Sequence, residues 1–328
     1  MKFAEVLPPA PNLTWTLARQ AGCTHAVSSF PHDGKGGFLT DFTSLQHQKQ
    51  RFADVGLDLA VIETGFPWLD LTKRGLPGRD EEIEKAREAI TNMGAAGIPI
   101  SCWNWMAVFN WTRTSTTTPA RGGAKVTSYD HSLMKDAPLT AAGTVTEEQL
   151  WDALKYFLDA VVPVAEEAGV QLALHPDDPP ISPIRGIGRI MTSVDAFQKA
   201  LDLYPSPNHG ITMCQGSFST MGVNIPETIR HFAKQDKIFF VHFRDVEGTP
   251  EKFVETFHDL GQTDMFEAMQ TYLDVEFDGP MRPDHVPTME GEQNLTPGYD
   301  VMGRLYALGY LRGLQEAAIK VRDKEKAA

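Results

Sequence analysis

The sequence predicts an α/β fold, a (β/α)8 TIM barrel in which one domain spans residues 1–328. The main observation is a series of eight short apolar runs bounded by turn residues, at 3–7, 24–30, 57–63, 98–104, 170–176, 210–214, 237–245 and 279–284. Such runs are typical of parallel strands buried on both faces. Eight strands close a TIM-type barrel, and that fold routinely uses 250 residues or more as one domain.

The segments between these runs carry helical patterns with recognisable ends. Residues 80–98 begin with acidic side chains, place apolar residues at helical spacing from Ile83 to Met93, and stop at a glycine. Residues 146–170 begin with a Thr-x-x-Gln capping pattern and end in Ala-Gly. Further helices are predicted at 193–204, 225–235 and 263–274. Each strand and helix together take roughly 30–40 residues, the size of one βα unit.

One interval is much longer than the others. Residues 103–146, after the fourth strand, are rich in Thr, Gly and Pro but also contain the aromatic residues Trp103, Trp105, Phe109 and Trp111. We expect a long inserted loop that acts as a lid over the active-site face of the barrel. The charged residues at 321–328 predict a solvated, frayed tail.

The composition narrows the class of protein. Acidic residues outnumber basic ones by 43 to 30, which gives a formal charge of −13. This balance argues against nucleic-acid and membrane partners. Three scattered cysteines do not form a disulfide framework, and no apolar run resembles a signal peptide or a membrane span. We therefore expect a cytoplasmic protein with a small-molecule partner.

The strand ends carry the residues with chemical potential. His175, Cys214, His242 and Asp284 fall at or near the ends of the last four predicted strands. The C-terminal strand ends of a barrel surround one mouth, so these side chains should converge there. Each alone has a structural interpretation, such as a hydrogen-bonded histidine or a buried cysteine. Together they predict a metal site, and their N, O and S atoms leave Mn²⁺, Fe²⁺, Co²⁺ and Zn²⁺ open.

Further charged residues follow the same strands. Asp177 and Asp178 come directly after the fifth strand, where they either orient the imidazole rings or form turn contacts. Arg244 lies two residues after His242, and Arg282 two residues before Asp284. Because residues two apart on a strand share a face, either arginine can bind an anionic substrate.

Two residues are candidates for proton transfer. His285 follows Asp284 directly, so it points differently from that ligand and is suited to act as an acid or base beside the metal. Tyr299 lies at the start of the last predicted helix, where a packing role is the alternative. The pattern does not assign acid and base between the two.

Several segments resemble the mannonate dehydratases, a family of the xylose-isomerase-like barrel superfamily. The resemblance covers about residues 55–318 and rests on LPGRDEEIEKAREAI, the Trp-Asn-Trp-Met and Asn-Trp-Thr-Arg-Thr stretch at 103–114, LALHPDDPP, MCQGS, HFRDV, FHDLGQTDM, RPDH and GYDVMGRLYALGYLRG. Residues 1–55 do not share it, and Gln215 stands where the family often has Thr or another small residue.

The resemblance implies a reaction and roles for the residues. It implies dehydration of D-mannonate to 2-dehydro-3-deoxy-D-gluconate in hexuronate catabolism, with Mn²⁺ or a similar divalent ion such as Fe²⁺ or Co²⁺. It identifies the ligands with His175, Cys214, His242 and Asp284 and the catalytic pair with His285 and Tyr299. It also suggests that Arg113 binds substrate, and we add Arg244, Arg282 and Asp177 to that set. We expect a homo-oligomer.

Other functions stay open at this point. A sugar isomerase or epimerase on the same barrel usually draws on carboxylate ligands, and Cys214 speaks against it. A dehydratase of a different aldonic acid is a second alternative. A sugar-acid binding protein without activity is a third, which the presence of His285 and Tyr299 disfavours. A serine hydrolase is excluded because the sequence has no nucleophile-elbow motif.

Overall fold

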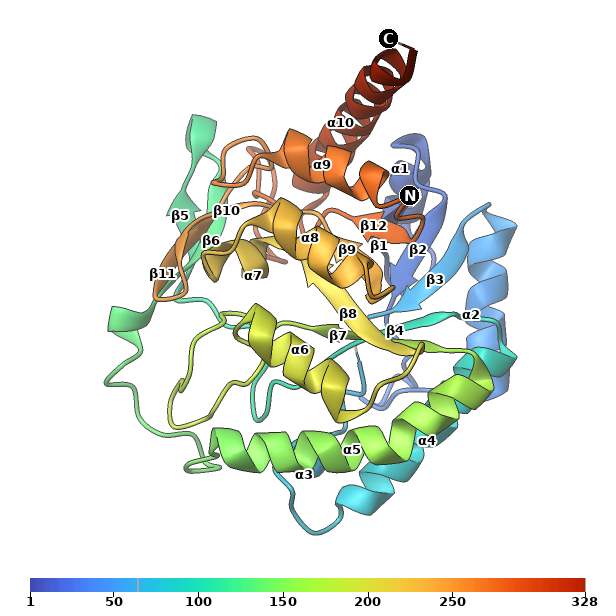
Figure 1. The fold of residues 1–328 in the computed structure, drawn as a ribbon, viewed down its shortest axis with the longest axis vertical. Coiled ribbons are helices and arrows are strands. Elements are labelled where there is room, and N and C mark those ends of the chain that lie inside the picture. The colour runs from blue at the N-terminus through green and yellow to red at the C-terminus, as the bar shows by residue number, and fades with distance from the viewer. Residues whose placement is uncertain (64, 328) are drawn as a thin grey trace.

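A closed barrel of eight parallel strands forms the centre of the computed structural model, which describes residues 1–63 and 65–327 (Figure 1). The barrel strands are β1 (Lys2–Val6), β2 (His25–Ser28), β3 (Asp58–Ile62), β4 (Ile100–Asn104), β7 (Gln171–His175), β8 (His209–Cys214), β9 (Ile238–His242) and β12 (Pro280–Arg282). Each of them falls on one of the eight apolar runs, to within a residue or two, so the predicted (β/α)8 fold is confirmed. Strands β1 and β12 pair, and segments from the two ends of the chain therefore close the barrel.

Helices surround the barrel. They are α1 (Leu13–Gln20), α2 (Phe42–Asp54), α3 (Asp70–Lys73), α4 (Arg79–Ala95), α5 (Glu147–Ala168), α6 (Val194–Leu203), α7 (Gln215–Thr220), α8 (Ile225–Ala233), α9 (Met265–Asp274) and α10 (Val301–Ala327). Helix α5 begins at the predicted capping box, in which Thr146 and Gln149 exchange hydrogen bonds. It ends at Gly169, whose φ of 67° is a left-handed conformation that glycine adopts at little cost.

The end of the chain differs from the prediction. Helix α10 continues to Ala327, whereas the sequence led us to expect a frayed tail. Its last turns project beyond the barrel in Figure 1. Residue 328 lies outside the described residues.

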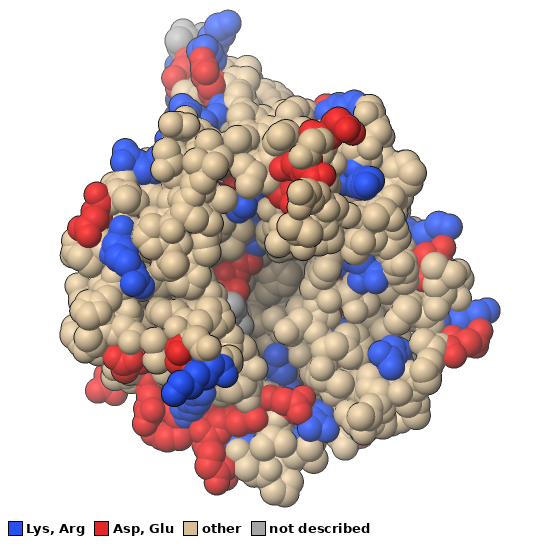
Figure 2. Space-filling view, turned by 180° about the vertical axis from the view of Figure 1, so that it is seen from behind, with Lys and Arg blue, Asp and Glu red and all other residues tan. Residues whose placement is uncertain are grey.

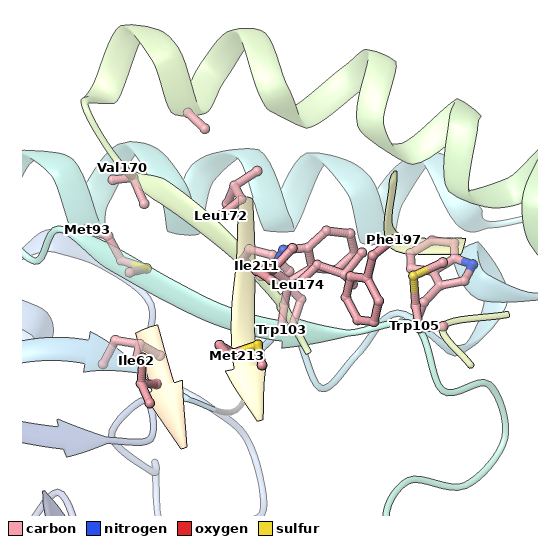
Figure 3. Close-up of a cluster of buried hydrophobic side chains, with 14 of the residues drawn as sticks. Ile62, Met93, Trp103, Trp105, Val170, Leu172, Leu174, Phe197, Ile211 and Met213 are labelled. Atoms are coloured by element: carbon pink, nitrogen blue, oxygen red, sulfur yellow. The ribbon is translucent and has the colours of Figure 1, made fainter. Parts of the chain in front are cut away.

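Apolar side chains fill the layer between the strands and the helices. Figure 3 shows Trp103, Leu174 and Ile211 from three neighbouring strands, together with Phe197 of α6. The Trp103 ring also packs on Phe157 of α5, with ring centroids 5.3 Å apart. Burying a side chain of this size contributes about 1.5–3 kcal/mol, so this layer holds the strand ends in place.

A second sheet of four antiparallel strands accompanies the barrel, at the left of Figure 1. Its strands are β5 (Ser115–Pro119), β6 (Lys125–Asp130), β10 (Val246–Thr249) and β11 (Lys252–Glu255), and short 3-10 turns lie at Arg121–Gly123 and His131–Leu133. The prediction of a loop over 103–146 is therefore wrong for β5 and β6. Strand β6 pairs with β11, which is more than a hundred residues away, and no local pattern reports such a partner.

The surface agrees with the acidic composition. On the face seen in Figure 2, basic side chains are scattered among acidic ones rather than gathered in one patch. Within residues 1–63 and 65–327, no helix has both the length and the apolar character of a membrane span. Cys23, Cys102 and Cys214 are buried and unpaired.

Candidate metal and catalytic site

The four predicted ligands lie together at the C-terminal end of the barrel. His175, Cys214 and His242 end the neighbouring strands β7, β8 and β9, and each offers an atom within 4.8 Å of the others. His175 Nε2 is 3.2 Å from His242 Nδ1. Asp284 follows β12, and its Oδ2 is 3.6 Å from both Cys214 Sγ and His242 Nδ1. Two imidazoles, a thiol and a carboxylate thus surround one position.

Both imidazole rings are held by contacts on their far side. His175 Nδ1 is 2.7 Å from the Pro176 carbonyl oxygen. A carbonyl only accepts, so Nδ1 donates and the Nε2 lone pair faces the cluster. His242 Nε2 is 3.2 Å from Glu63 Oε1, a charge contact without the alignment of a good hydrogen bond. The ring therefore turns Nδ1 toward the cluster. A carboxylate behind a metal-binding histidine usually orients the ring in this way.

The electrostatics of the cluster favour anionic ligands. Burial alone would raise the pKa of the Cys214 thiol, but the Arg244 guanidinium and His175 lower it well below its usual range. Burial likewise opposes ionisation of Asp284, and His285 and His242 overcome it to hold the pKa of that carboxyl well below normal. A thiolate and a carboxylate 3.6 Å apart in a buried site repel each other unless a cation lies between them.

A charge balance supports the same conclusion. Five buried or nearly buried anionic groups face three guanidinium groups. The anionic groups belong to Glu63, Asp178, Cys214, Glu255 and Asp284, and the guanidinium groups belong to Arg113, Arg244 and Arg282. The anionic groups outnumber the guanidinium groups, so the cluster favours a cation. Burial and Arg282 lower the pKa of His242, yet Glu63 and Asp284 raise it well above normal, so without an ion this field attracts a proton. The donor set therefore fits a divalent metal ion.

Arg244 organises the carboxylates behind the ligands. Its Nε is 2.7 Å from Asp284 Oδ2, its Nη1 2.5 Å from Glu255 Oε2, and its Nη2 2.8 Å from Asp178 Oδ2. The side chain is 1% exposed. Gly216 of α7 makes room for it, because a Cβ there would lie 2.5 Å from Arg244 Nη1. The sequence suggested a substrate contact for Arg244, but these donors point at protein carboxylates.

Arg113 and Arg282 are engaged in the same way. Arg113 donates through Nη1 to Asp178 Oδ1 at 2.6 Å and also contacts Glu255. Arg282 Nε donates to Glu63 Oε2 at 2.8 Å, and its Nη1 is 3.0 Å from Asp284 Oδ1. Both side chains are 1% exposed. Their predicted substrate-binding role stays a prediction, and the observed contacts are with the residues around the ligands.

Asp177 lies away from the ligands. It accepts a hydrogen bond from Met191 N at 2.7 Å and one from Arg189 Nη1 at 3.3 Å. Arg189 in turn donates to the Phe109 carbonyl oxygen at 3.0 Å. Asp177 thereby anchors the long segment after β4. The sequence suggested that this carboxylate orients the imidazole rings, but among the described residues it contacts neither ring.

His285 and Tyr299 lie side by side. Their rings meet edge to face, with centroids 5.3 Å apart at 89°. His285 Nδ1 is 2.9 Å from Glu255 Oε1, and its Nε2 is 3.8 Å from Asp284 Oδ1. Tyr299 donates to Asp284 Oδ1 at 3.3 Å. Burial and the Asp284 charge raise the pKa of Tyr299, so the phenol keeps its proton at neutral pH.

A cavity of about 340 Å³ joins three of the predicted ligands, His175, His242 and Asp284, to this pair, and the buried Cys214 lies behind its lining. Its lining is Glu63, Gly65, Pro67, Cys102, Trp103, Asn104, Met106, Asn110, Trp111, His175, Asp178, His242, Asp284, His285 and Tyr299. This set contains no arginine or lysine from the described chain. The buried Gln215 lies outside the lining and contacts Met265 instead, with Nε2 3.5 Å from its Sδ. The departure from the family pattern at 215 is therefore away from the cavity.

Sequence reasoning missed Glu63, Glu255 and Asn104. Glu63 and Asn104 end two of the predicted apolar runs, so the criterion that found the ligands also applies to them. Glu255 lies on β11 of the second sheet, and no pattern in the sequence pointed to it.

Comparisons with known proteins identify relatives over most of the chain. The family model for D-mannonate dehydratase (UxuA) matches residues 9–142 and 137–325. Mannonate dehydratase 2 of Halalkalibacterium halodurans is 39% identical over 290 residues, covering 80% of this chain and 83% of the relative. The mannonate dehydratase of Thermotoga maritima is 36% identical over 323 residues, covering 88% of this chain and 89% of the relative.

Solved structures agree. The mannonate dehydratase of Streptococcus suis serotype 2 has a TM-score of 0.89 and 32% identity, covering 98% of this chain and 95% of that one. A xylose isomerase domain protein from Planctomyces limnophilus, at 14% identity and a TM-score of 0.62, covers 97% of this chain and 98% of its own and shares the fold.

The family match extends further than the sequence suggested. It begins at residue 9, so the expectation that residues 1–55 lie outside the resemblance is wrong for most of that segment. Strands β1 and β2 of the barrel lie in this segment, and none of the four predicted ligands and neither member of the predicted proton-transfer pair comes from it.

Proposed function

The chain belongs to the mannonate dehydratase family, and we propose that the site at its strand ends removes water from D-mannonate to give 2-dehydro-3-deoxy-D-gluconate. The protein is thus a hydro-lyase, and we place its reaction in hexuronate catabolism. The observation that carries the proposal is the adjacency, at one cavity, of a metal-competent donor set and the pair His285 and Tyr299, whose rings are in contact and which are each held by a carboxylate.

We assign the metal to His175, Cys214, His242 and Asp284, with Mn²⁺ as the ion and Fe²⁺ or Co²⁺ as substitutes. The convergence of the four donors and the excess of anionic over guanidinium groups around them support this assignment. When bound, a divalent ion polarises substrate oxygens and offsets the negative charge that develops beside the substrate carboxylate. No lysine or arginine lines the cavity among the residues described, which leaves the substrate anion in need of this charge.

His285 is the base in our assignment. Glu255 holds the Nδ1 proton, so the lone pair on Nε2 is free to take the proton from C2 of the sugar acid. The C2–H electron pair then forms the C2=C3 double bond as the C3–O bond breaks.

Tyr299 is the acid that completes this step. Its phenol is protonated, because burial and Asp284 raise its pKa. It donates that proton to the departing hydroxyl, and the hydroxyl leaves as water. The enol product tautomerises to the 2-ketone. Each proton transfer contributes about 10²–10⁴-fold to the rate.

An activity measurement with product analysis tests the function. Metal-stripped protein reloaded with Mn²⁺ should convert D-mannonate to a 2-keto-3-deoxy acid whose mass is lower by one water. An epimerase or isomerase would leave the mass unchanged. Loaded protein that is inert toward D-mannonate and its C2 and C5 epimers would refute the dehydratase function, and tight binding without turnover would identify a binding protein.

The cellular setting is also part of the proposal. We place the protein in the cytoplasm, where three buried, unpaired cysteines are stable, as one domain that assembles into a homo-oligomer. Light scattering coupled to size-exclusion chromatography tests the assembly, and a monomeric mass would refute it.

A further inference from the structure

Asn104 presents an amide whose orientation is fixed by its neighbours. Its Oδ1 is 3.2 Å from Lys73 Nζ and 3.1 Å from Met106 N, and both of these groups only donate at neutral pH. A flipped amide would turn its NH₂ toward two donors, so the hydrogen bonds assign Oδ1 to this side. Nδ2 then points elsewhere, and within residues 1–63 and 65–327 it has no hydrogen-bond partner.

The amide lies at the junction of two cavities. Asn104 ends β4 and is the register partner of His175 on β7. It lines the main cavity of about 340 Å³ and an adjoining cavity of about 100 Å³. The two cavities also share Gly65 and Met106, and Lys73 lines the smaller one. The carbon chain of a substrate that extends from the metal ligands toward β4 therefore passes Asn104.

A six-carbon acid needs such a passage. In the function proposed above, the reaction involves C1 to C3, which lie at the ligands, His285 and Tyr299. The remaining three carbons carry hydroxyl groups that lose water on entering the cavity, and each such group needs a replacement partner. An amide NH₂ supplies two donors to hydroxyl oxygens.

We propose that Asn104 Nδ2 binds the distal hydroxyl groups, at C5 and C6, and that the smaller cavity receives this end of the substrate. This rests on the proposed function and adds a residue that sets the preferred length of the sugar acid. Lys73 is a positioning residue, because it holds Oδ1 and also donates to the Met106 carbonyl oxygen at 3.1 Å. Burial and Arg189 lower the pKa of Lys73 to about 8, so it still carries its proton at neutral pH.

Two substrates separate this role from a general one. L-Erythronate has the C2 and C3 configuration of D-mannonate but lacks C5 and C6, so it reacts at the same centres without the distal contacts. For Asn104→Leu we expect kcat/KM for D-mannonate to fall about 10- to 100-fold, while the value for L-erythronate changes by less than about 3-fold. Lys73→Met should raise KM for D-mannonate about 3- to 10-fold with kcat nearly unchanged.

The controls keep the outcome decisive. Asn104→Ser replaces Asn104→Leu if the latter does not fold, as judged by its melting temperature. If L-erythronate turns over too slowly, calorimetry gives the same comparison. Binding of both acids is then measured to Mn²⁺-loaded His285→Asn protein with and without Asn104→Leu. An equal fall for both acids, or no change for either, would overturn the distal role. Wild-type protein inert toward D-mannonate would instead overturn the dehydratase function itself.

Discussion

Replacing Arg244 with methionine should lower the stability of the protein even when no substrate is present. The guanidinium contacts Asp284, Glu255 and Asp178 within 2.5–2.8 Å and is 1% exposed. Methionine fills much of the same volume but leaves three buried carboxylates without this partner. Removing one member of a buried, hydrogen-bonded charge network costs about 3–5 kcal/mol.

The size of the change in melting temperature follows from the chain length. Unfolding entropy is about 2.1 cal/mol/K per residue, or about 0.7 kcal/mol/K for a chain of 328 residues. A loss of about 3–5 kcal/mol therefore lowers the melting temperature by about 4–7 °C. Differential scanning calorimetry of metal-stripped wild-type and Arg244→Met protein measures this directly.

Arg87→Met is the matched control. Arg87 pairs with Glu84 at 2.7 Å, but the two side chains are 45% and 58% exposed. Such a pair contributes less than about 1 kcal/mol, so the control should shift by less than about 1.5 °C. If Arg244→Met melts within about 2 °C of Arg87→Met and loses only substrate affinity, Arg244 binds substrate and our account of the network is wrong.

Three further results are expected. His285→Asn should keep its metal in elemental analysis and lose about 10²–10⁴-fold in kcat, whereas Cys214→Ala should lose the metal; equal metal loss would move His285 into the ligand set. Chelation should lower the melting temperature, and Mn²⁺ at 100 times its Kd should restore about 2.7 kcal/mol; an unchanged melting curve would contradict a metal site. Burial lowers the pKa of His209 from 6.5 to about 4. The unfolded chain then binds a proton before the folded one, so the free energy of unfolding should fall by about 3 kcal/mol between pH 7 and 4. In urea titrations His209→Gln should lose less over this range, and parallel curves would refute the assignment.

The barrel could be predicted from the sequence because its strands are buried on both faces. Runs such as 170–176 are apolar throughout, and the chemical residues stand out at their ends. The same contrast located His175 and Cys214 without knowledge of their neighbours. The family resemblance then supplied the reaction and the pair of His285 and Tyr299.

What the sequence did not reveal depends on partners distant along the chain. Arg113 meets Glu255 from 142 residues away, and Arg282 meets Glu63 from 219 residues away. An arginine near a strand end is interpreted as a substrate contact as long as the carboxylate that faces it in the fold is unknown. The second sheet was missed for the same reason, since the pairing of β6 with β11 joins two hairpins that lie more than a hundred residues apart.

That second sheet also bears on how the protein folds. It supplies Glu255 on β11, and Arg113 lies two residues before β5; both belong to the network around Arg244. Closing a chain loop of this length is entropically costly, and contacts between distant segments tend to form late. The pairing of β1 with β12 that closes the barrel joins segments still further apart along the chain, so barrel closure and completion of the site both belong to the late steps. We expect activity to return after fluorescence from the buried tryptophans during refolding, because Trp103 and Trp105 pack on each other locally, whereas the Arg113–Glu255 contact behind His285 joins distant segments.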